Sequence, residues 1–414
     1  MLDPDPGGDV EVVHIEVIKS LAEKTDSRIV MAVVDGLGGL PHPDTGRTAL
    51  ESARTPNLDA LAAKSSCGLV EPVGIGITPG SGPSHLALFG YDPLKHEIGR
   101  GVLEALGVGL ELERRDVAAR GNFCTVDESG VITDRRAGRI PTEKNCELVG
   151  LLRRIRVDGA EVILKPGKLH RFVAVFRGEG LSGDIEDTDP QHVGERPKPA
   201  VPRAPDAGAE RTARIMNQWL DRAREVLRDQ HPANMVLLRG FARHPDIPTM
   251  SDAFKLTPAA IATYPMYRGV ARLIGMQVLE TGTTIVDEVK TLRDSLERFD
   301  FFYLHVKETD SAGEDGNFAR KVEVLEEFDR NLPAILELGP DVLVVTGDHS
   351  TPAVLKAHSW HPVPFLLYSK WVRPDRISGF GEAACAGGSL GTFPSLGALP
   401  LAMAHALKLA KFGA

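Results

Sequence analysis

Short, wholly apolar runs in the first and last thirds of the chain predict buried β-strands. Each run is rich in β-branched or aromatic residues and too short for a helix, as expected of a strand covered on both faces of its sheet. We expect such strands at residues 29–34, 301–306, 341–346 and 364–368. Between them, helices are expected at residues 55–64, 84–89 and 318–338. This alternation predicts an α/β fold with a parallel-rich sheet sandwiched by helices.

The middle of the chain has a different pattern. Short strand-like runs alternate with Gly-rich turns from residue 109 to 187, and a Pro-rich stretch that disfavours a packed helix follows at residues 189–208. We therefore predict a smaller α+β domain inserted into the larger one. The expected bounds are residues 1–110 and 266–414 for the two halves of the larger domain and residues 111–265 for the insert.

Composition is that of an ordinary globular protein. The chain has 414 residues, of which 42% are hydrophobic and 25% charged, and this length favours two domains. It contains no run of 18 apolar residues, and the acidic, Pro-rich residues 1–6 do not resemble a secretory signal peptide. Four cysteines without metal-like spacing are expected to be small buried thiols in a reducing compartment. We expect a cytoplasmic protein with no membrane partner.

The net charge of −9 argues against a general nucleic-acid partner, because nucleic-acid binding requires a basic face. It does not exclude an anionic small substrate, since a local arginine cluster or a metal ion can override the overall sign.

Acidic side chains and histidines gather at predicted strand ends. Asp35, Asp310 and the pair Asp348-His349 each follow a strand, and the carboxyl ends of parallel strands are where ligands bind in such sheets. Glu314, His358 and a Gly-flanked Ser81 lie nearby in the sequence. Such a mixed oxygen and nitrogen set suits two divalent cations such as Mn²⁺ or Zn²⁺, with Ser81 as a metal-activated nucleophile. Each piece alone has a simpler explanation, since a strand-end Asp is often a helix cap and Gly-Ser-Gly is usually a turn.

Four motifs resemble those of the archaeal-type cofactor-independent phosphoglycerate mutases, which belong to the alkaline phosphatase superfamily. They are Val-Val-Asp-Gly-Leu-Gly-Gly at 33–39, Thr-Pro-Gly-Ser at 78–81, Leu-Ala-Leu-Phe-Gly-Tyr-Asp-Pro at 86–93 and Gly-Asp-His-Ser at 347–350. The likeness extends through segments at 99–101, 135–140, 187–190 and 264–269, and so includes the insert. The metal motifs are shared with phosphatases, whereas the insert motifs are specific to the mutases.

The resemblance implies an alkaline phosphatase-like fold and a two-metal, phosphoserine mechanism that interconverts 3-phosphoglycerate and 2-phosphoglycerate without 2,3-bisphosphoglycerate. One metal ion would be held by Asp35, Ser81, Asp348 and His349, and the other by Asp310, His358 and Glu314. Mn²⁺ is favoured, with Mg²⁺, Zn²⁺ or Co²⁺ as alternatives. The inserted domain would act as a lid that excludes water.

Basic residues are the candidates for binding this small phosphorylated three-carbon acid. Arginine suits bidentate contacts to oxyanions, although a solvated basic strip is an equally simple explanation for any one side chain. The favoured residues are Arg136, Arg139 and His170 in the insert, together with Arg268 and Lys307, which are expected to act from the metal-binding domain.

Glu314 is a departure from the resembling motif, in which a histidine is more usual at this place. We expect Glu314 to be a ligand, and the alternative is that it starts a helix while His361 supplies the missing imidazole.

Two other functions stay open for the protein as a whole. One is a metal-dependent phosphohydrolase or phosphonate-cleaving enzyme that uses the same residues, and the other is a catalytically inactive metal-binding relative. The sequence determines neither the metal ion nor the oligomeric state.

Overall fold

The apolar run at residues 29–34 forms β1 (Ile29–Val34), every residue of which is buried within the larger of two sheets. The computed structural model describes residues 14–96 and 98–413. The acidic, Pro-rich residues 1–6 lie outside this part of the chain. Within it, no helix combines the length and the apolar composition needed to cross a membrane.

The chain divides into two structural units, each described separately below. Unit 1 comprises residues 1–96, 248–264 and 274–414, and unit 2 comprises residues 97–247 and 265–273. These bounds differ from the expected residues 110 and 265. Residues 97–110 and 265–273 group with the middle of the chain, whereas residues 248–264 group with the larger unit and supply a strand to its sheet.

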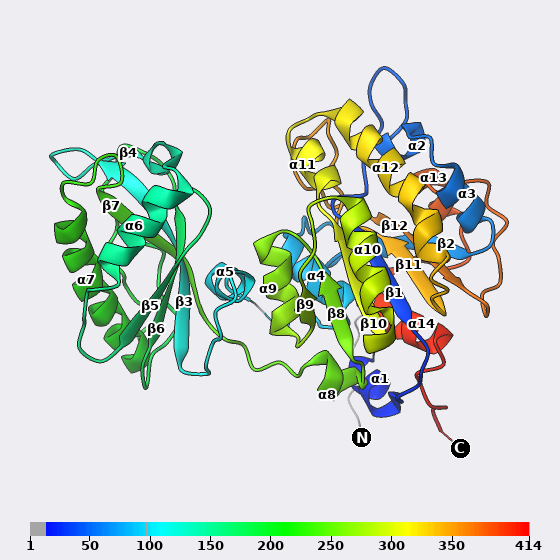
Figure 1. Ribbon diagram of the computed structural model, residues 1–414, viewed down its shortest axis with the longest axis horizontal. Coiled ribbons are helices and arrows are strands. Elements are labelled where there is room, and N and C mark those ends of the chain that lie inside the picture. The colour runs from blue at the N-terminus through cyan, green and yellow to red at the C-terminus, as the bar shows by residue number, and fades with distance from the viewer. Residues whose placement is uncertain (1–13, 97, 414) are drawn as a thin grey trace, which may run out of the picture. The chain divides into compact units, whose positions relative to one another are not determined.

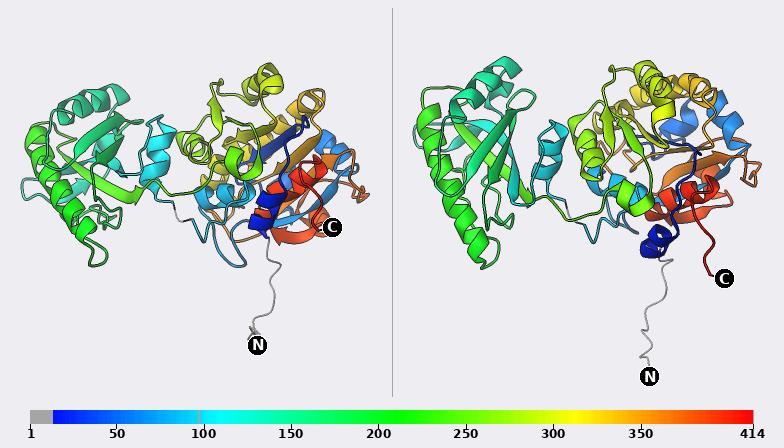
Figure 2. Two further views of the ribbon diagram at one scale, coloured as in Figure 1. Left: turned by 90° about the horizontal axis from the view of Figure 1, so that it is seen from below. Right: turned by 60° about the horizontal axis from the view of Figure 1, so that its bottom comes forward.

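Unit 1 is built on an eight-stranded sheet with the order β13-β2-β12-β11-β1-β10-β8-β9. Its strands are β1, β2 (Ser66–Glu71), β8 (Pro258–Ile261), β9 (Gln277–Leu279), β10 (Phe301–Val306), β11 (Val342–Thr346), β12 (Val363–Ser369) and β13 (Gly391–Pro394). Its α-helices are α1 (Ile15–Leu21), α2 (Ala49–Ser52), α3 (Pro56–Ala62), α4 (Ser81–Leu88), α8 (Met250–Phe254), α10 (Ile285–Ser295), α11 (Glu308–Glu314), α12 (Phe318–Leu336), α13 (Glu382–Ala386) and α14 (Ala398–His405) (Figure 1). Helices α12 and α14 lie on opposite faces of this sheet (Figure 2). The expected α/β fold with a parallel-rich sheet between helices is confirmed.

One strand of this sheet runs against the expected direction. β12 pairs antiparallel with both of its neighbours, β11 and β2, whereas the other neighbouring pairs in the described sheet are parallel. The segment from residue 347 to 362 contains no helix that could cross over the sheet, so the chain returns in the opposite direction.

Two helix starts also differ from expectation. The helix expected at residues 84–89 starts earlier, because α4 begins at Ser81. Thr55 precedes α3, but its side chain makes no capping hydrogen bond. The buried carboxylate of Asp329 accepts the N–H groups of Asn57 and Leu58 instead, at 3.4 and 2.7 Å. A side chain distant in the sequence thus satisfies N–H groups at the start of α3 that a local cap would otherwise bind.

Unit 2 has a five-stranded antiparallel sheet, in which β3 pairs with β4, β6 and β7, and β6 pairs with β5. Its strands are β3 (Asp116–Val126), β4 (Ile132–Asp134), β5 (Glu161–Pro166), β6 (Arg171–Arg177) and β7 (Met235–Arg243). Its α-helices are α5 (Arg100–Gly107), α6 (Thr142–Leu152), α7 (Ala207–Leu227) and α9 (Pro265–Leu273).

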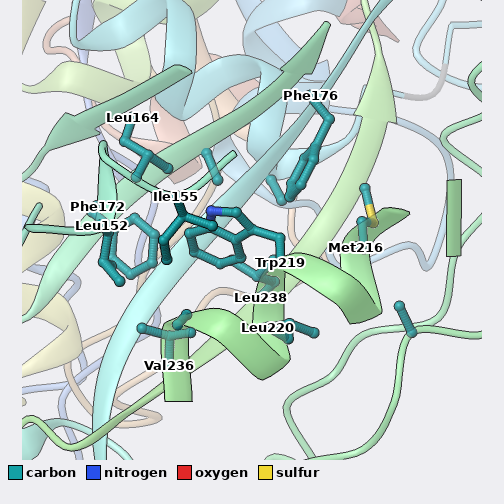
Figure 3. Packing of buried hydrophobic residues seen from close by; sticks show 14 of the residues in the cluster. Leu152, Ile155, Leu164, Phe172, Phe176, Met216, Trp219, Leu220, Val236 and Leu238 are labelled. Carbon is teal, nitrogen blue, oxygen red and sulfur yellow. The ribbon is translucent and has the colours of Figure 1, made fainter. Parts of the chain in front are cut away.

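A single aromatic anchor organises the core of unit 2. Trp219 of α7 is fully buried against the sheet, with Phe176 of β6 edge-on at 5.9 Å between ring centroids (Figure 3). Burial of such large rings contributes much of the hydrophobic stabilisation of a small core.

One of the four cysteines departs from the expected burial. Cys146 on α6 is exposed, whereas Cys67, Cys124 and Cys385 are buried.

Candidate metal centre and anion site

Three neighbouring strands bring the predicted acids together at one edge of the large sheet. β1 lies between β10 and β11 with all three strands parallel, so that Val34 is in register with Val306 and Val33 with Thr346. Asp35 directly follows β1, while Asp310 lies on α11 after β10 and Asp348 follows β11 by one residue (Figure 1). The carboxyl ends of parallel strands meet at this edge, as the sequence predicted.

The first cluster contains Asp35, Asp348 and His349, whose side chains are fully buried. One ligand atom from each lies within 4.8 Å of the others. His349 Nε2 is 3.4 Å from Asp35 Oδ1 and 3.1 Å from Asp348 Oδ2. The Ser81 hydroxyl, at the first turn of α4, lies 3.1 Å from the same nitrogen. The candidate nucleophile therefore adjoins the cluster.

The second cluster contains Asp310, His349 and His358, again with ligand atoms within 4.8 Å of one another. His358 Nε2 is 3.5 Å from Asp310 Oδ1 and 3.8 Å from Glu314 Oε1. Its ring stacks on His349 with centroids 3.7 Å apart. Glu314 is half-exposed at the rim of this cluster, and His361 instead contacts the Ser359 hydroxyl and the ring of Trp360.

Hydrogen bonds fix which nitrogen of each histidine faces the clusters. Thr351 Oγ1 lies 2.6 Å from Asp310 Oδ1 and 3.0 Å from His349 Nδ1. An ionised carboxylate only accepts, so the hydroxyl donates to Asp310 and accepts the Nδ1–H of His349. His358 Nδ1 likewise donates to the Pro79 carbonyl at 2.9 Å. Both Nε2 atoms are therefore left with a lone pair directed at the acids, which is the tautomer that a metal ligand requires.

The electrostatics of the clusters suit a divalent cation. Burial lowers the pKa of His349 and so favours the neutral imidazole. Burial alone would raise the pKa of Asp35, but His305 and Lys307 hold it well below its ordinary value and keep the carboxylate ionised. Its Oδ1 is buried and accepts no hydrogen bond from the described residues. A buried ionised oxygen of this kind needs a compensating cation, and these oxygen and nitrogen donors fit Mn²⁺, Mg²⁺ or Zn²⁺.

Lys307 bridges the two clusters. It follows β10, and its ammonium bonds to Asp35 Oδ2 at 3.1 Å and also to Asp310 Oδ2. Although burial favours the neutral amine, the two carboxylates hold the pKa of Lys307 above its ordinary value. The structure thus places this predicted substrate-binding residue among the predicted ligands, with one carboxylate of each cluster as its partner.

Unit 2 contains a separate cationic cluster that includes Arg136, Arg139 and His170. His170 is buried, and burial followed by the charges of Arg171, Arg120, Arg136 and Arg139 lowers its pKa to about 4. Its Nδ1 has no hydrogen-bond partner among the described residues. Neighbouring Arg135 differs, because it forms a two-point ion pair with Asp189 at 2.9 and 2.6 Å. The cluster therefore combines several positive charges with a buried polar atom, His170 Nδ1, that makes no hydrogen bond to the described residues.

The turn that carries two of these arginines has an unusual backbone. Ala137, Gly138 and Arg139 all have positive φ angles of 45°, 62° and 54°. The carboxylate of Asp134 accepts the N–H groups of Arg136 and Gly138 at 2.8 and 2.6 Å and so stabilises the turn. Left-handed conformations at residues other than glycine are costly and concentrate at functional sites.

Arg268 lies on α9 in unit 2 and not in the metal-binding unit, where it was expected. α9 packs closely on α5 because both helices have glycine at the contact. A Cβ atom on Gly269 would lie 2.0 Å from the Leu103 carbonyl oxygen, and one on Gly107 would lie 2.1 Å from that of Pro265. This tight pairing holds α9 within unit 2.

Sequence reasoning missed Arg120 and Thr351. Arg120 is buried on β3, where burial first, and then the charge of Arg100, lower its pKa to about 10. The apolar residues on either side of it, at 117–119 and 123–124, predict a buried strand, and an arginine within such a strand is a signal that could have marked it. Thr351 gave no such signal, since a threonine two residues after an Asp-His pair is unremarkable in a loop.

Comparison with known proteins assigns a family to this chain. The sequence model of the 2,3-bisphosphoglycerate-independent phosphoglycerate mutases matches residues 62–234. A protein of Thermosipho africanus named as a probable member is 52% identical over 401 residues, which cover 96% of this chain and 99% of that protein. This chain belongs to that family. Mutases are isomerases, so the membership confirms both the resemblance and the enzyme class that the sequence predicted.

Further relatives agree with this assignment. A probable mutase of Thermus thermophilus is 52% identical over 403 residues and 96% of this chain. Among solved structures, a protein from Pyrococcus horikoshii covers 94% of this chain and 100% of its own length at a TM-score of 0.81 and 30% identity. A cofactor-independent phosphoglycerate mutase from Thermoplasma acidophilum covers 92% and 100%, at a TM-score of 0.73 and 32% identity.

Proposed function

We propose that this mutase interconverts 3-phosphoglycerate and 2-phosphoglycerate by passing the phosphoryl group through Ser81. The observation that carries the proposal is the position of the Ser81 hydroxyl, 3.1 Å from His349 Nε2. That imidazole belongs to both clusters of buried ligands. A hydroxyl in this position suits a nucleophile, whereas a protein that only bound metal ions would have no use for it.

The proposal assigns one divalent ion to Asp35, Ser81, Asp348 and His349, and a second to Asp310, Glu314 and His358. Bound there, the two ions would stabilise the charge on the transferred phosphoryl group and lower the pKa of the Ser81 hydroxyl. Mn²⁺ is the favoured ion because the ligands are mostly hard oxygens with some imidazole nitrogen, and Mg²⁺, Zn²⁺ and Co²⁺ are the alternatives.

The reaction has two balanced steps. In the first, the Ser81 hydroxyl loses its proton and its oxygen bonds to phosphorus, while the bond from phosphorus to the substrate O3 breaks and O3 takes up a proton. In the second, O2 of the same glycerate loses a proton and bonds to phosphorus, while the bond from phosphorus to the Ser81 oxygen breaks and that oxygen takes up a proton. Helix α4 begins at Ser81, so the positive end of its dipole favours the negative phosphoryl oxygens in both steps.

Glycerate must stay bound and turn over between the steps, and transfer to water must be prevented. We assign its carboxylate to the cationic cluster of unit 2, with Arg136, Arg139 and His170 as ligands and Arg268 as a further candidate. Lys307 is assigned to the phosphoryl group. The proposal includes a cytoplasmic location, which the four free cysteines support.

Incubation of the Mn²⁺-loaded protein with 3-phosphoglycerate, in the absence of 2,3-bisphosphoglycerate, tests this function. We expect 2-phosphoglycerate to form faster than inorganic phosphate, and a sample treated with a chelator to form neither. Phosphate release that outpaced isomer formation would instead favour a phosphohydrolase with the same residues. A metal-loaded protein without either activity would indicate an inactive metal-binding relative.

A further inference from the structure

Lys321 is a buried lysine whose hydrogen bonds all go to backbone carbonyls near the metal ligands. It lies in the first turn of α12 and is 0% exposed. Its Nζ donates to the carbonyl oxygens of Gly36, Gly38 and Thr351 at 2.7, 2.9 and 2.9 Å. An ammonium group has three N–H donors, so these three bonds use all of them.

The three carbonyls belong to the two loops that carry the ligands. Gly36 and Gly38 follow Asp35 in the loop after β1, and Thr351 follows Asp348 and His349 in the loop after β11. Neither loop belongs to a helix or a long strand, so regular backbone hydrogen bonds do not define its shape. A single nitrogen atom thus joins both segments, through bonds that are stronger than neutral ones because the donor is charged.

Direct contacts between the loops carry this constraint to the ligands. The Gly36 N–H donates to Asp348 Oδ1 at 3.1 Å, and the Thr351 N–H donates to the Gly38 carbonyl at 3.0 Å. The loops also approach very closely, because a Cβ atom on Gly38 would lie 1.9 Å from Ser350 Oγ. A shift of one loop would therefore displace the other.

Thr351 extends the constraint to the second cluster. Its hydroxyl donates to Asp310 and accepts from His349 Nδ1, as described above. His349 contributes to both clusters. The connection from Lys321 thus reaches ligands of both proposed metal sites, although Lys321 itself bonds to none of them.

We propose that Lys321 is a positioning residue for metal binding, which locks the loops after β1 and β11 together so that both sites bind their divalent cations tightly. The inference rests on the proposed metal-dependent function and deepens it. Replacement of a single ligand should weaken mainly the site to which it belongs. Loss of the Lys321 ammonium should weaken both sites together.

Equilibrium dialysis of the metal-free full-length chain against Mn²⁺ tests this inference. We expect Lys321→Met, which keeps the length of the aliphatic stem but lacks the ammonium group, to weaken Mn²⁺ binding about 10–100-fold at both sites, as loss of supporting contacts typically does. Lys408→Met is the matched control. Lys408 is also 0% exposed and donates to a backbone carbonyl, that of Thr25, and to Asp300. This control should lose stability but bind Mn²⁺ as the wild type does.

A folded Lys321→Met chain that binds two Mn²⁺ ions with wild-type affinity would overturn the inference. If this variant does not fold, Lys321→Gln replaces it in the test. Its neutral, shorter side chain keeps two N–H donors, so it should disturb folding less and still weaken Mn²⁺ binding at both sites, by a smaller factor. Equal losses of affinity in Lys321→Met and Lys408→Met would also overturn it, since the effect would then be one of general stability. A wild-type chain that binds no divalent cation would instead contradict the proposed metal-dependent function.

Discussion

Thr351 donates its hydroxyl proton to Asp310, with the two oxygens 2.6 Å apart, and so acts as a hydrogen-bond acceptor towards His349. This relationship links two segments 41 residues apart in the chain. It also sets the tautomer of the one imidazole that both ligand clusters share. The geometry of the proposed metal centre therefore depends on a residue that would not itself bind metal.

Replacement of Thr351 tests this dependence. In Thr351→Val the hydroxyl is lost at nearly constant volume, so His349 Nδ1 and Asp310 Oδ1 both lose a buried partner. We expect Mn²⁺ affinity and mutase activity to fall together by about 10–100-fold. Thr351→Ser, which keeps the hydroxyl, should retain most of both. Equal affinity in the Val and Ser variants, measured by calorimetric titration with Mn²⁺, would mean that the hydroxyl does not position the ligands.

Ser81→Ala should abolish mutase activity and any phosphate release, because no other group is proposed to accept the phosphoryl group. The fold should persist, since a single hydroxyl at the start of α4 contributes little to packing. Acid-quenched wild-type reactions, analysed by mass spectrometry, should show phosphate on Ser81. Phosphate trapped on a different side chain would refute this assignment.

Glu288 should make the stability of the fold depend on pH. It lies on α10 with 4% of its surface exposed, and burial, supported by the charges of Glu308 and Asp287, raises its pKa from 4.5 to about 9. Between about pH 4.5 and pH 9, Glu288 keeps its proton in the native state but releases it in the unfolded chain. The free energy of unfolding should therefore fall as the pH rises through this range. Glu288→Gln should remove this loss and stabilise the protein by about 1–3 kcal/mol at pH 7.

Urea unfolding of the metal-free protein at pH 5, 7 and 9 measures this effect. The difference between Glu288→Gln and the wild type should be smallest at pH 5 and grow towards pH 9. Glu143→Gln, which changes an exposed carboxylate on α6, is the control and should show no such trend. A constant difference across the three pH values would show that the carboxyl group of Glu288 does not titrate in this window.

Sequence patterns predicted the large sheet better than its connections. The strand at residues 29–34 could be recognised from its own apolar composition. The antiparallel direction of β12 depends on the absence of a crossover helix after β11, and the hydrophobic pattern of β12 itself does not show its direction. The same contrast holds at the site. Strand ends located Asp35, Asp310 and Asp348, because the carboxyl ends of parallel strands must meet.

The supporting residues were harder to predict, because their roles depend on contacts between distant segments. Lys321 occupies the apolar stripe of α12 together with Val324, Leu325 and Phe328, and a charged residue on that stripe was a signal that went unused. Asp329, which accepts N–H groups at the start of α3, is a second buried charge on α12, but the sequence does not show which donors it binds. Such contacts become visible only once the tertiary structure is known.

Substrate binding by the cationic cluster of unit 2 can be separated from chemistry by kinetics. Arg139→Ala should raise the KM for 3-phosphoglycerate about 10–100-fold, the loss expected on removal of one charged hydrogen bond to a carboxylate. Mn²⁺ affinity should not change, because the metal ligands lie in unit 1. Arg214→Ala, an exposed arginine on α7, is the control and should leave KM unaltered. An unchanged KM in Arg139→Ala would show that Arg139 does not bind the substrate and belongs to a solvated basic strip.

Glu314 and His361 remain the two candidates to complete the second metal site, and their surroundings differ. Glu314 Oε1 lies 3.8 Å from His358 Nε2, a separation that a shared cation could bridge. His361 Nδ1 contacts the Ser359 hydroxyl at 3.0 Å, and its ring stacks on exposed Trp360 at 4.9 Å between centroids. We therefore expect Glu314 to be the ligand. The alternative that it starts a helix is not supported, because Glu314 is the last residue of α11, where the helix dipole disfavours an acid, and α12 begins only at Phe318.

Three variants distinguish Glu314 from His361 as the ligand through their metal content. If Glu314 is a ligand, Glu314→Gln should bind one Mn²⁺ ion tightly and the second about 10-fold or more weakly, because a neutral amide oxygen replaces a carboxylate. Glu314→His should shift preference towards Zn²⁺, since an imidazole is a softer ligand, and His361→Ala should change neither metal content nor activity. If instead His361→Ala lost the second ion while Glu314→Gln stayed fully loaded and active, the imidazole of His361 would be the ligand, and Glu314 would have no part in metal binding.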